Sequence, residues 1–222
     1  MKTMKMKTKM AAFILFMAAI TLAACSKEDT VEPGAKVVYE DDFTGTSKWP
    51  ITSNEGYLVS LKDGKYIHEL IGTRGFNMDL PLSIFTGNEK KQIVEYTLQA
   101  RSSANTGTTA TVISFNLDAA TKNGKNIYIS DTKYYQINSN VNGELLIEKD
   151  WTLESSADLS KKSVVKVELE NSVITIYYNG KLLYRWTGSG AATLDRIAIG
   201  AIGWGNETIT VEVDRVRALA IE

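Results

Sequence analysis

The sequence is poor in the residues that mark disulfide, zinc and hydrolase chemistry. Its 222 residues include one cysteine, one histidine and three prolines. A single cysteine cannot form an intramolecular disulfide, and Cys25 with His68 supplies too few ligands for the usual zinc sites. A Gly-x-Ser-x-Gly elbow is absent as well. We interpret His68, which shares strand parity with Tyr66, as a structural residue on a strand face and not as a general base.

The N-terminal residues have the pattern of a secretion signal. Four lysines precede an apolar run, Ala11–Ile20, that is too short to span a bilayer as a stable helix. Leu22–Cys25 then resembles the lipobox of bacterial lipoproteins, in which the signal peptide is cut before an acylated cysteine. The resemblance implies a signal peptide over residues 1–24 and lipidation of Cys25, whose two or three acyl chains would anchor the protein. An ordinary buried cysteine is the alternative.

Residues 25–36 are polar and lack periodicity, so we expect a flexible tether there. Ser26–Asp29 also resembles the acidic export tag that sends some lipoproteins of Gram-negative bacteria to the outer face of the outer membrane. This resemblance implies an outer-membrane lipoprotein that faces the cell surface. An acidic linker without that role, and a periplasmic orientation, stay open as alternatives.

The charge balance argues against a nucleic-acid partner. Without the four leader lysines, the chain has 21 Lys+Arg against 26 Asp+Glu, a net charge near −5. A mildly acidic protein does not attract phosphate backbones, whereas neutral glycans are compatible with it.

From Val37 onward the sequence has an almost continuous β pattern. Apolar and polar residues alternate in short runs that are separated by Asp-Gly and Asn-Gly turns. The expected strands are Val37–Glu40, Tyr57–Leu61, Lys65–Glu69, Gln92–Arg101, Thr109–Leu117, Asn126–Ser130, Tyr134–Asn138, Glu144–Glu148, three strands within Val164–Trp186, Arg196–Ile202 and Thr208–Ile221. We predict one all-β domain over residues 37–222, a two-sheet antiparallel β-sandwich. Residues 76–85 and 152–162 are ambiguous, and the second segment suits a loop or a short helical turn.

The stretch Val164–Trp186 predicts three consecutive strands near the centre of a sheet. Asn179-Gly180 suits the two positive-φ positions of a type I′ hairpin turn. With a two-residue loop, Ile176 faces Leu183, and one face of the hairpin collects Tyr177, Tyr184 and Trp186.

The last expected strand changes parity. Its apolar positions are odd up to Val213, but the next one is Val216. This shift predicts a β-bulge near Asp214-Arg215.

Three stretches, in this order, resemble the concanavalin A-like lectin/glucanase sandwich, including its laminin-G-like members. They are the entry strand Tyr39–Phe43 followed by Trp49, the hairpin Ile174–Leu183, and the closing pair Arg196–Gly200 with Val211–Val216. The resemblance implies a jelly roll whose first and last strands are neighbours. It also implies a glycan-related role, because many members bind or cleave carbohydrate.

The resemblance allows one catalytic motif to be checked. Members related to glycoside hydrolase family 16 carry a Glu-x-Asp-x-x-Glu pattern, which places two carboxylates about 5–5.5 Å apart on one strand face. The nearest match is Glu212, Asp214 and Arg217, where arginine replaces the last acid. This replacement argues against that activity, and we interpret Glu212 and Asp214 as structural.

Carboxylates on the first and last strands raise the possibility of a calcium site. Asp41 and Asp42 end the first expected strand, and Asp214 lies in the last. If those strands are neighbours, the three carboxylates converge on a structural calcium ion. Turn capping at Thr44-Gly45 and ion pairs with lysine or arginine are the alternative, and no other cofactor is expected.

Aromatic residues supply the binding hypothesis. Sugar rings stack on aromatic faces, while neighbouring polar groups take the hydroxyl hydrogen bonds. The candidates are Tyr177, Tyr184 and Trp186 on the hairpin, and Trp151 and Trp204 in expected loops. The alternative is that they fill the core, as we expect of Trp49.

We therefore predict a lipid-anchored cell-envelope protein that binds carbohydrate without cleaving it, in glycan capture or uptake. The patterns favour a binding protein over an enzyme without deciding the point. One alternative is a glycoside-processing enzyme whose acids are dispersed along the chain. Another is an adhesion or assembly module that binds a surface protein.

Overall fold

The computed structural model describes residues 32–80, 83–104, 106–118, 120–187, 189, 191 and 193–222. The expected signal peptide, Cys25 and the tether up to residue 31 lie outside the described residues. None of the described residues belongs to a helix that is long and apolar enough to cross a membrane.

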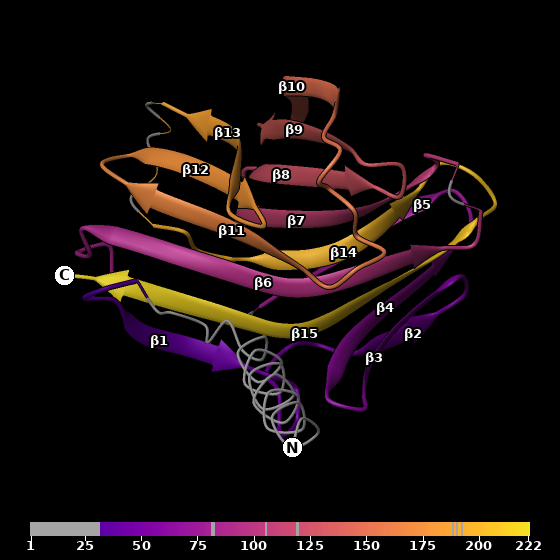
Figure 1. The fold of residues 1–222 in the computed structure, drawn as a ribbon, viewed down its shortest axis with the longest axis horizontal. Helices are drawn as coiled ribbons and strands as arrows, with labels where there is room; N and C mark the ends of the chain where they lie inside the picture. Colours follow the sequence, from indigo (N-terminus) through magenta and orange to yellow (C-terminus); the bar gives the residue numbers. More distant parts are fainter. Residues whose placement is uncertain are drawn as a thin grey trace, which may run out of the picture. The chain divides into compact units, whose positions relative to one another are not determined.

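The described chain from Gly34 onward forms two antiparallel sheets (Figure 1). The strands are β1 (Lys36–Asp41), β2 (Thr52–Asn54), β3 (Tyr57–Lys62), β4 (Lys65–Ile71), β5 (Arg74–Asp79), β6 (Lys91–Ser102), β7 (Thr109–Asp118), β8 (Asn123–Ser130), β9 (Tyr134–Val141), β10 (Glu144–Leu153), β11 (Ser163–Glu170), β12 (Val173–Tyr178), β13 (Lys181–Trp186), β14 (Ala198–Gly203) and β15 (Thr208–Ile221). The nine-stranded sheet has the order β13-β12-β11-β6-β15-β4-β3-β2, with β1 paired to β15. The six-stranded sheet has the order β10-β9-β8-β7-β14-β5. This arrangement confirms the predicted all-β sandwich.

The first and last strands are neighbours, as the family resemblance implied. β1 pairs with β15, so that Glu40 faces Arg217 and Asp41 faces Val216. The predicted bulge is also confirmed, because the register between β15 and β6 shifts between Val213 and Arg215.

The hairpin of β12 and β13 differs from the predicted register. Asn179 and Gly180 have positive φ values of 47° and 80°, as a type I′ turn requires. Beyond the turn, however, a bulge shifts the pairing by one residue, and Ile176 faces Tyr184 instead of Leu183. Since one residue of slip exchanges the two faces of a strand, Tyr177 does not share a face with Tyr184 and Trp186.

Some segment boundaries differ from the prediction, and the structure decides the two segments that were ambiguous. β10 continues through Trp151 to Leu153, so Trp151 lies in a strand and not in a loop. The ambiguous segment 76–85 begins inside β5, and residues 154–162 form turns without a helix. A short strand, β2, was not expected from the sequence.

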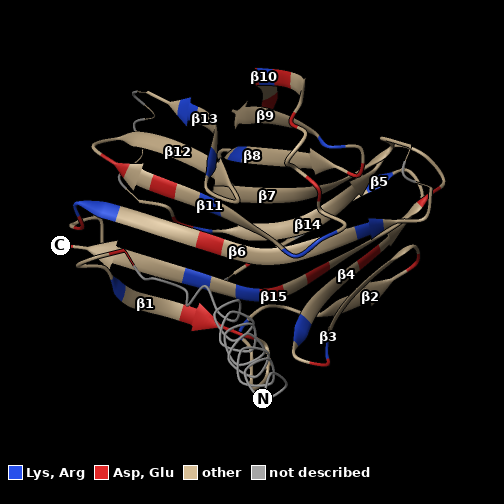
Figure 2. Cartoon of the chain, in the orientation of Figure 1, with Lys and Arg blue, Asp and Glu red and all other residues tan. Residues whose placement is uncertain are grey.

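The core fills the space between the sheets. Alternate residues of both sheets point inward and form one buried cluster, which includes Val94, Tyr96 and Leu98 of β6 and Ile113 and Phe115 of β7. Charged residues gather on β6, β11 and β15 of the nine-stranded sheet, while β14 and most of β7 carry none (Figure 2). The outward face of the six-stranded sheet is therefore the less charged surface of the sandwich.

Candidate functional site

A row of buried polar side chains crosses the outward face of the six-stranded sheet. Ile113 and Ile127 point into the core, so their neighbours Ser114 and Asn126 point outward. Ser114, Asn126 and Asn138 occupy adjacent positions on β7, β8 and β9. All three are at most 4% exposed, although they face away from the core. We call these three residues the amide row.

Hydrogen bonds link the amide row to a tyrosine. Ser114 Oγ donates to Asn126 Oδ1 at 2.7 Å, and Asn126 Nδ2 donates to Asn138 Oδ1 at 2.9 Å. The Asn138 amide in turn hydrogen-bonds the Tyr128 side chain, while burial raises the pKa of the Tyr128 hydroxyl. Because each amide has its oxygen fixed by a donor, the row holds the Tyr128 ring in one place.

Three aromatic rings meet beside this row. The ring centroids of Tyr128 and Trp151 are 6.4 Å apart, and those of Trp151 and Trp204 are 5.6 Å apart, with the two indoles nearly perpendicular. Trp151 is 36% exposed and Trp204 is 44% exposed. Edge-to-face contacts of this kind stabilise aromatic clusters. We call Tyr128, Trp151 and Trp204 the aromatic platform.

The platform requires the sheet to bend. Trp151 lies on β10 and Trp204 directly follows β14, and three strands separate β10 from β14 in the sheet order. At about 4.8 Å per strand, the backbones of the two residues would lie about 19 Å apart in a flat sheet. Two register shifts in β10, on either side of Lys149, introduce the bulges that bend a strand. The two indole side chains therefore reach toward each other across β9, β8 and β7 on the outward face of the sheet.

Polar groups border the platform. Gln136 Nε2 donates to Asp150 Oδ1 at 3.4 Å, and Asp150 also accepts the Trp151 backbone N–H at 2.7 Å. On the Trp204 side, the Trp204 backbone N–H donates to Thr108 O at 2.8 Å. The Thr108 hydroxyl lowers the pKa of the nearby Glu207 carboxyl. An exposed ring surface flanked by amide, hydroxyl and carboxylate groups suits the mixed apolar and polar surface of a sugar.

Two of the five aromatic residues predicted from the sequence thus belong to the platform, and the sequence reasoning missed Tyr128. Its position at the middle of a period-2 strand resembled that of a core residue. The outward parity of Tyr128 relative to Ile127 and Ile129 was the available signal.

The other three predicted aromatic residues lie elsewhere. Trp186 is 6% exposed, with Tyr184 packed edge-on against it at 5.0 Å and Lys125 Nζ 4.6 Å from its ring centroid. Tyr177 lies on the outward face of the nine-stranded sheet, where Lys166 Nζ is 4.7 Å from its centroid. Trp186 therefore packs with the core, and Tyr177 lies on the opposite sheet from the platform.

The nearest match to the catalytic motif lies on β15 of the nine-stranded sheet. Its charged residues Glu212, Asp214 and Arg217 form ion pairs there. Glu212 pairs with Lys65 and accepts a hydrogen bond from Gln99 Nε2 at 2.6 Å. Arg217 Nη2 lies 2.6 Å from Glu95 Oε2. The structural interpretation of Glu212 and Asp214 stays a prediction.

The three aspartates proposed for calcium have local partners. Asp41 accepts hydrogen bonds from Ser47 Oγ at 2.7 Å and from the Phe43 N–H at 2.9 Å. Asp42 accepts from the Thr44 hydroxyl at 2.7 Å, and Asp214 lies 2.8 Å from Lys162 Nζ. Within the described ranges, no three His, Cys, Asp or Glu side chains are grouped so that they could hold a metal ion. Calcium binding here stays a prediction.

His68 is buried among aromatic side chains. It is 2% exposed and packs edge-on against Tyr66 at a centroid distance of 4.8 Å. Burial lowers the pKa of the imidazole to about 3, so the ring is neutral at physiological pH.

Comparisons with known proteins identify the fold. No protein-family profile matches the sequence, and no curated protein is similar to it in sequence. Among solved structures, the catalytic domain of an endo-1,3-β-glucanase (laminarinase) from Thermotoga petrophila matches with a TM-score of 0.59 and 11% identity over 85% of this chain and 98% of that one. The κ-carrageenase of Pseudoalteromonas carrageenovora, solved with an oligotetrasaccharide of κ-carrageenan, matches with a TM-score of 0.56 and 11% identity over 88% and 99%. The β-glucanase of Bacillus licheniformis matches with a TM-score of 0.57 and 12% identity over 85% of this chain and 99% of that one. The chain therefore has the concanavalin A-like jelly-roll fold of these glycoside hydrolases.

Proposed function

We propose that this protein binds a glycan chain at the aromatic platform without cleaving it. The observation that carries the proposal is the cluster of Tyr128, Trp151 and Trp204, in which the two tryptophan rings are exposed beside the buried polar side chains of the amide row. A preorganised aromatic surface binds sugar at little conformational cost, because the amide row already fixes one of its rings. The glycan-active proteins that share the fold support the same class of ligand by analogy.

The composition of the same face favours binding over catalysis. Glycoside hydrolysis requires two carboxyl groups that flank the scissile bond. The outward positions of the four central strands carry no Asp or Glu. They are Ala110, Val112, Ser114, Gly124, Asn126, Tyr128, Ser130, Tyr134, Gln136, Asn138, Asn140, Ala198, Gly200 and Ile202. Asp150 and Glu207 at the border, and Asp79 opposite Ala198 on β5, are acids that an alternative, glycoside-processing function would use.

A polysaccharide panel tests both functions at once. Purified protein is incubated with each polysaccharide, and both retention and the release of reducing ends are measured. Retention without release supports glycan binding, and release supports the enzyme. No retention on any polysaccharide contradicts the proposal. Trp204→Ala should weaken retention by about tenfold or more, whereas the matched control Tyr177→Ala, an aromatic truncation on the other sheet, should leave it unchanged.

A protein-binding module is the third possibility, and one observation favours it. β10 is an edge strand that exposes Leu145, Leu146 and Ile147 by 59%, 53% and 51%. Exposed apolar edges of this kind attract partner chains. If Leu146→Lys no longer binds a protein partner but still retains glycan, this edge has a role separate from glycan binding.

We further propose that the protein is a surface-facing outer-membrane lipoprotein that captures glycan for uptake. The lipobox-like Leu22–Cys25 and the acidic Ser26–Asp29 support this location. Metabolic labelling with a radioactive or alkyne-bearing fatty acid should modify the wild-type protein and not Cys25→Ala. Protease added to intact cells should degrade the protein, and complete protection would contradict surface exposure.

A further inference from the structure

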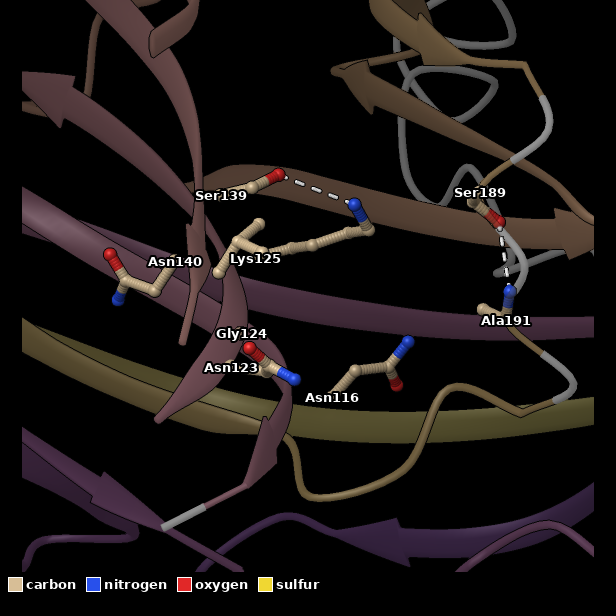
Figure 3. A pocket seen from close by; sticks show the side chains of 9 residues that line it. Asn116, Asn123, Gly124, Lys125, Ser139, Asn140, Ser189 and Ala191 are labelled. Carbon is tan, nitrogen blue, oxygen red and sulfur yellow. Dashed lines mark hydrogen bonds between the residues drawn. The ribbon is translucent and has the colours of Figure 1, made fainter. Parts of the chain in front are cut away.

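A cavity lies at the opposite end of β8 from Tyr128. It has a volume of about 260 Å³ and is lined by the end of β7, the start of β8, the end of β9 and the segment after β13. In Figure 3, the side chains of Asn116, Asn123 and Lys125 lie on the side of β9 that faces Ser189 and Ala191. Asn140 points to the opposite side. We call this cavity the end pocket.

Two amides of the end pocket are oriented by backbone donors. Asn116 Oδ1 accepts the Asp195 N–H at 3.0 Å, and Asn123 Oδ1 accepts the Asn142 N–H at 2.6 Å. An asparagine whose oxygen is fixed in this way turns its two Nδ2 hydrogens away from that donor. Both side chains are partly buried and line the cavity, so they present N–H groups to whatever occupies it.

Lys125 adds a third, positively charged donor. Its Nζ donates to Ser139 Oγ at 3.3 Å and lies over the Trp186 ring, so only part of its hydrogen-bonding capacity is used by these contacts. The Ser139 hydroxyl in turn donates a hydrogen bond to Glu148 Oε1 at 2.9 Å. Burial lowers the pKa of Lys125, and the Glu148 charge raises it. A bound anion would compensate the desolvation of this ammonium group.

The geometry points to a ligand with negatively charged oxygen atoms, and we propose that the end pocket binds the carboxylate or sulfate group of an acidic sugar. Asn116, Asn123 and Lys125 supply the donors, and charge-assisted hydrogen bonds to oxyanions are the strongest such contacts available. The cavity is slightly below the roughly 300–1,000 Å³ of sites for drug-sized ligands, which suits a single substituted sugar ring. The proposal is independent of glycan binding at the platform, because no platform residue lines this pocket.

Calorimetric titration of the purified protein tests the proposal with four probes: D-galacturonate, D-galactose 4-sulfate, D-galactose and inorganic sulfate. We expect one acidic sugar to bind, which identifies carboxylate or sulfate as the recognised group, while neutral galactose does not bind. Binding of galactose with equal affinity, inorganic sulfate binding as tightly as the sulfated sugar, or no binding of either acidic sugar would each overturn the proposal.

Three variants locate the binding. Lys125→Met should weaken it by about tenfold or more, since hydrogen bonds to charged groups are worth about 1.5–3 kcal/mol. Lys62→Met, the same change on an exposed strand of the other sheet, should have no effect. Asn123→Asp keeps the acceptor for Asn142 and places a negative charge in the pocket, so it should weaken binding in a folded protein even if Lys125→Met unfolds. Unchanged affinity in Asn123→Asp would refute the site.

The platform provides the last control. Trp151→Ala should leave binding of the acidic sugar intact. If Trp151→Ala abolishes it, the sugar binds at the platform and the end pocket is not its site.

Discussion

Trp151 lies on β10 and Trp204 directly follows β14, and three strands separate these two in the sheet, yet the two indole rings meet nearly perpendicular with centroids 5.6 Å apart. The contact spans β9, β8 and β7 on the outward face of the six-stranded sheet. It also gives the proposed glycan site its two most exposed rings.

The two tryptophans should contribute to glycan binding as a coupled pair. Each single change, Trp151→Ala and Trp204→Ala, should weaken binding to a retained polysaccharide by about tenfold or more, because truncating a central aromatic residue costs about 2 kcal/mol or more. The double variant should lose less than the two single losses combined, since each ring supports the other. Affinity electrophoresis of the four proteins measures this coupling, and strict additivity would show that the rings act separately.

The amide row should stabilise the fold as well as the platform. Asn138→Ala removes the acceptor of Asn126 Nδ2 and the partner of Tyr128, leaving buried polar groups unpaired. We expect a loss of about 1–3 kcal/mol in the free energy of unfolding. Asn140→Ala makes the same truncation two residues along the same face at a less buried position, and it should cost less. Urea denaturation compares the two, and equal losses would contradict a special role for the row.

Trp186 should behave as a core residue. Trp186→Ala should lower the free energy of unfolding by about 3–5 kcal/mol, as other replacements of a large core side chain by alanine do. Any folded fraction should still bind polysaccharide, because Trp186 does not belong to the platform. A stable Trp186→Ala protein that fails to bind would return Trp186 to the glycan site, as the sequence first suggested.

His68 should make the fold sensitive to mild acid. Its pKa is lowered from the ordinary value of 6.5 to about 3 by burial, so between these values the unfolded chain binds a proton that the folded chain does not. The contribution to stability is therefore complete above about pH 6.5 and declines as the pH falls toward 3, with a slope of up to about 1.4 kcal/mol per pH unit.

Denaturation of the wild type and of His68→Leu at several pH values checks this dependence. The variant removes the titrating group and retains an apolar side chain, so its stability should fall less steeply with acid. Parallel curves for the two proteins would show that other groups cause the acid sensitivity.

The all-β sandwich, the turn at Asn179-Gly180 and the bulge near Asp214 could be predicted because they depend on local alternation and turn chemistry. The bulge in β13 could not be predicted in the same way. Nothing between Lys181 and Trp186 interrupts the alternation, and the one-residue shift becomes apparent only in the pairing with β12. That shift moved Tyr177 away from Tyr184 and Trp186.

The sequence by itself determined which residues alternate, where the chain turns, and that Trp151 and Trp204 needed an explanation. Only the tertiary structure decided which of the aromatic residues meet. Their contact depends on strand order and on the bending of β10, and both are set by packing between segments far apart in the chain. The amide row was hidden for the same reason, because Ser114, Asn126 and Asn138 become neighbours only when three strands pair in register.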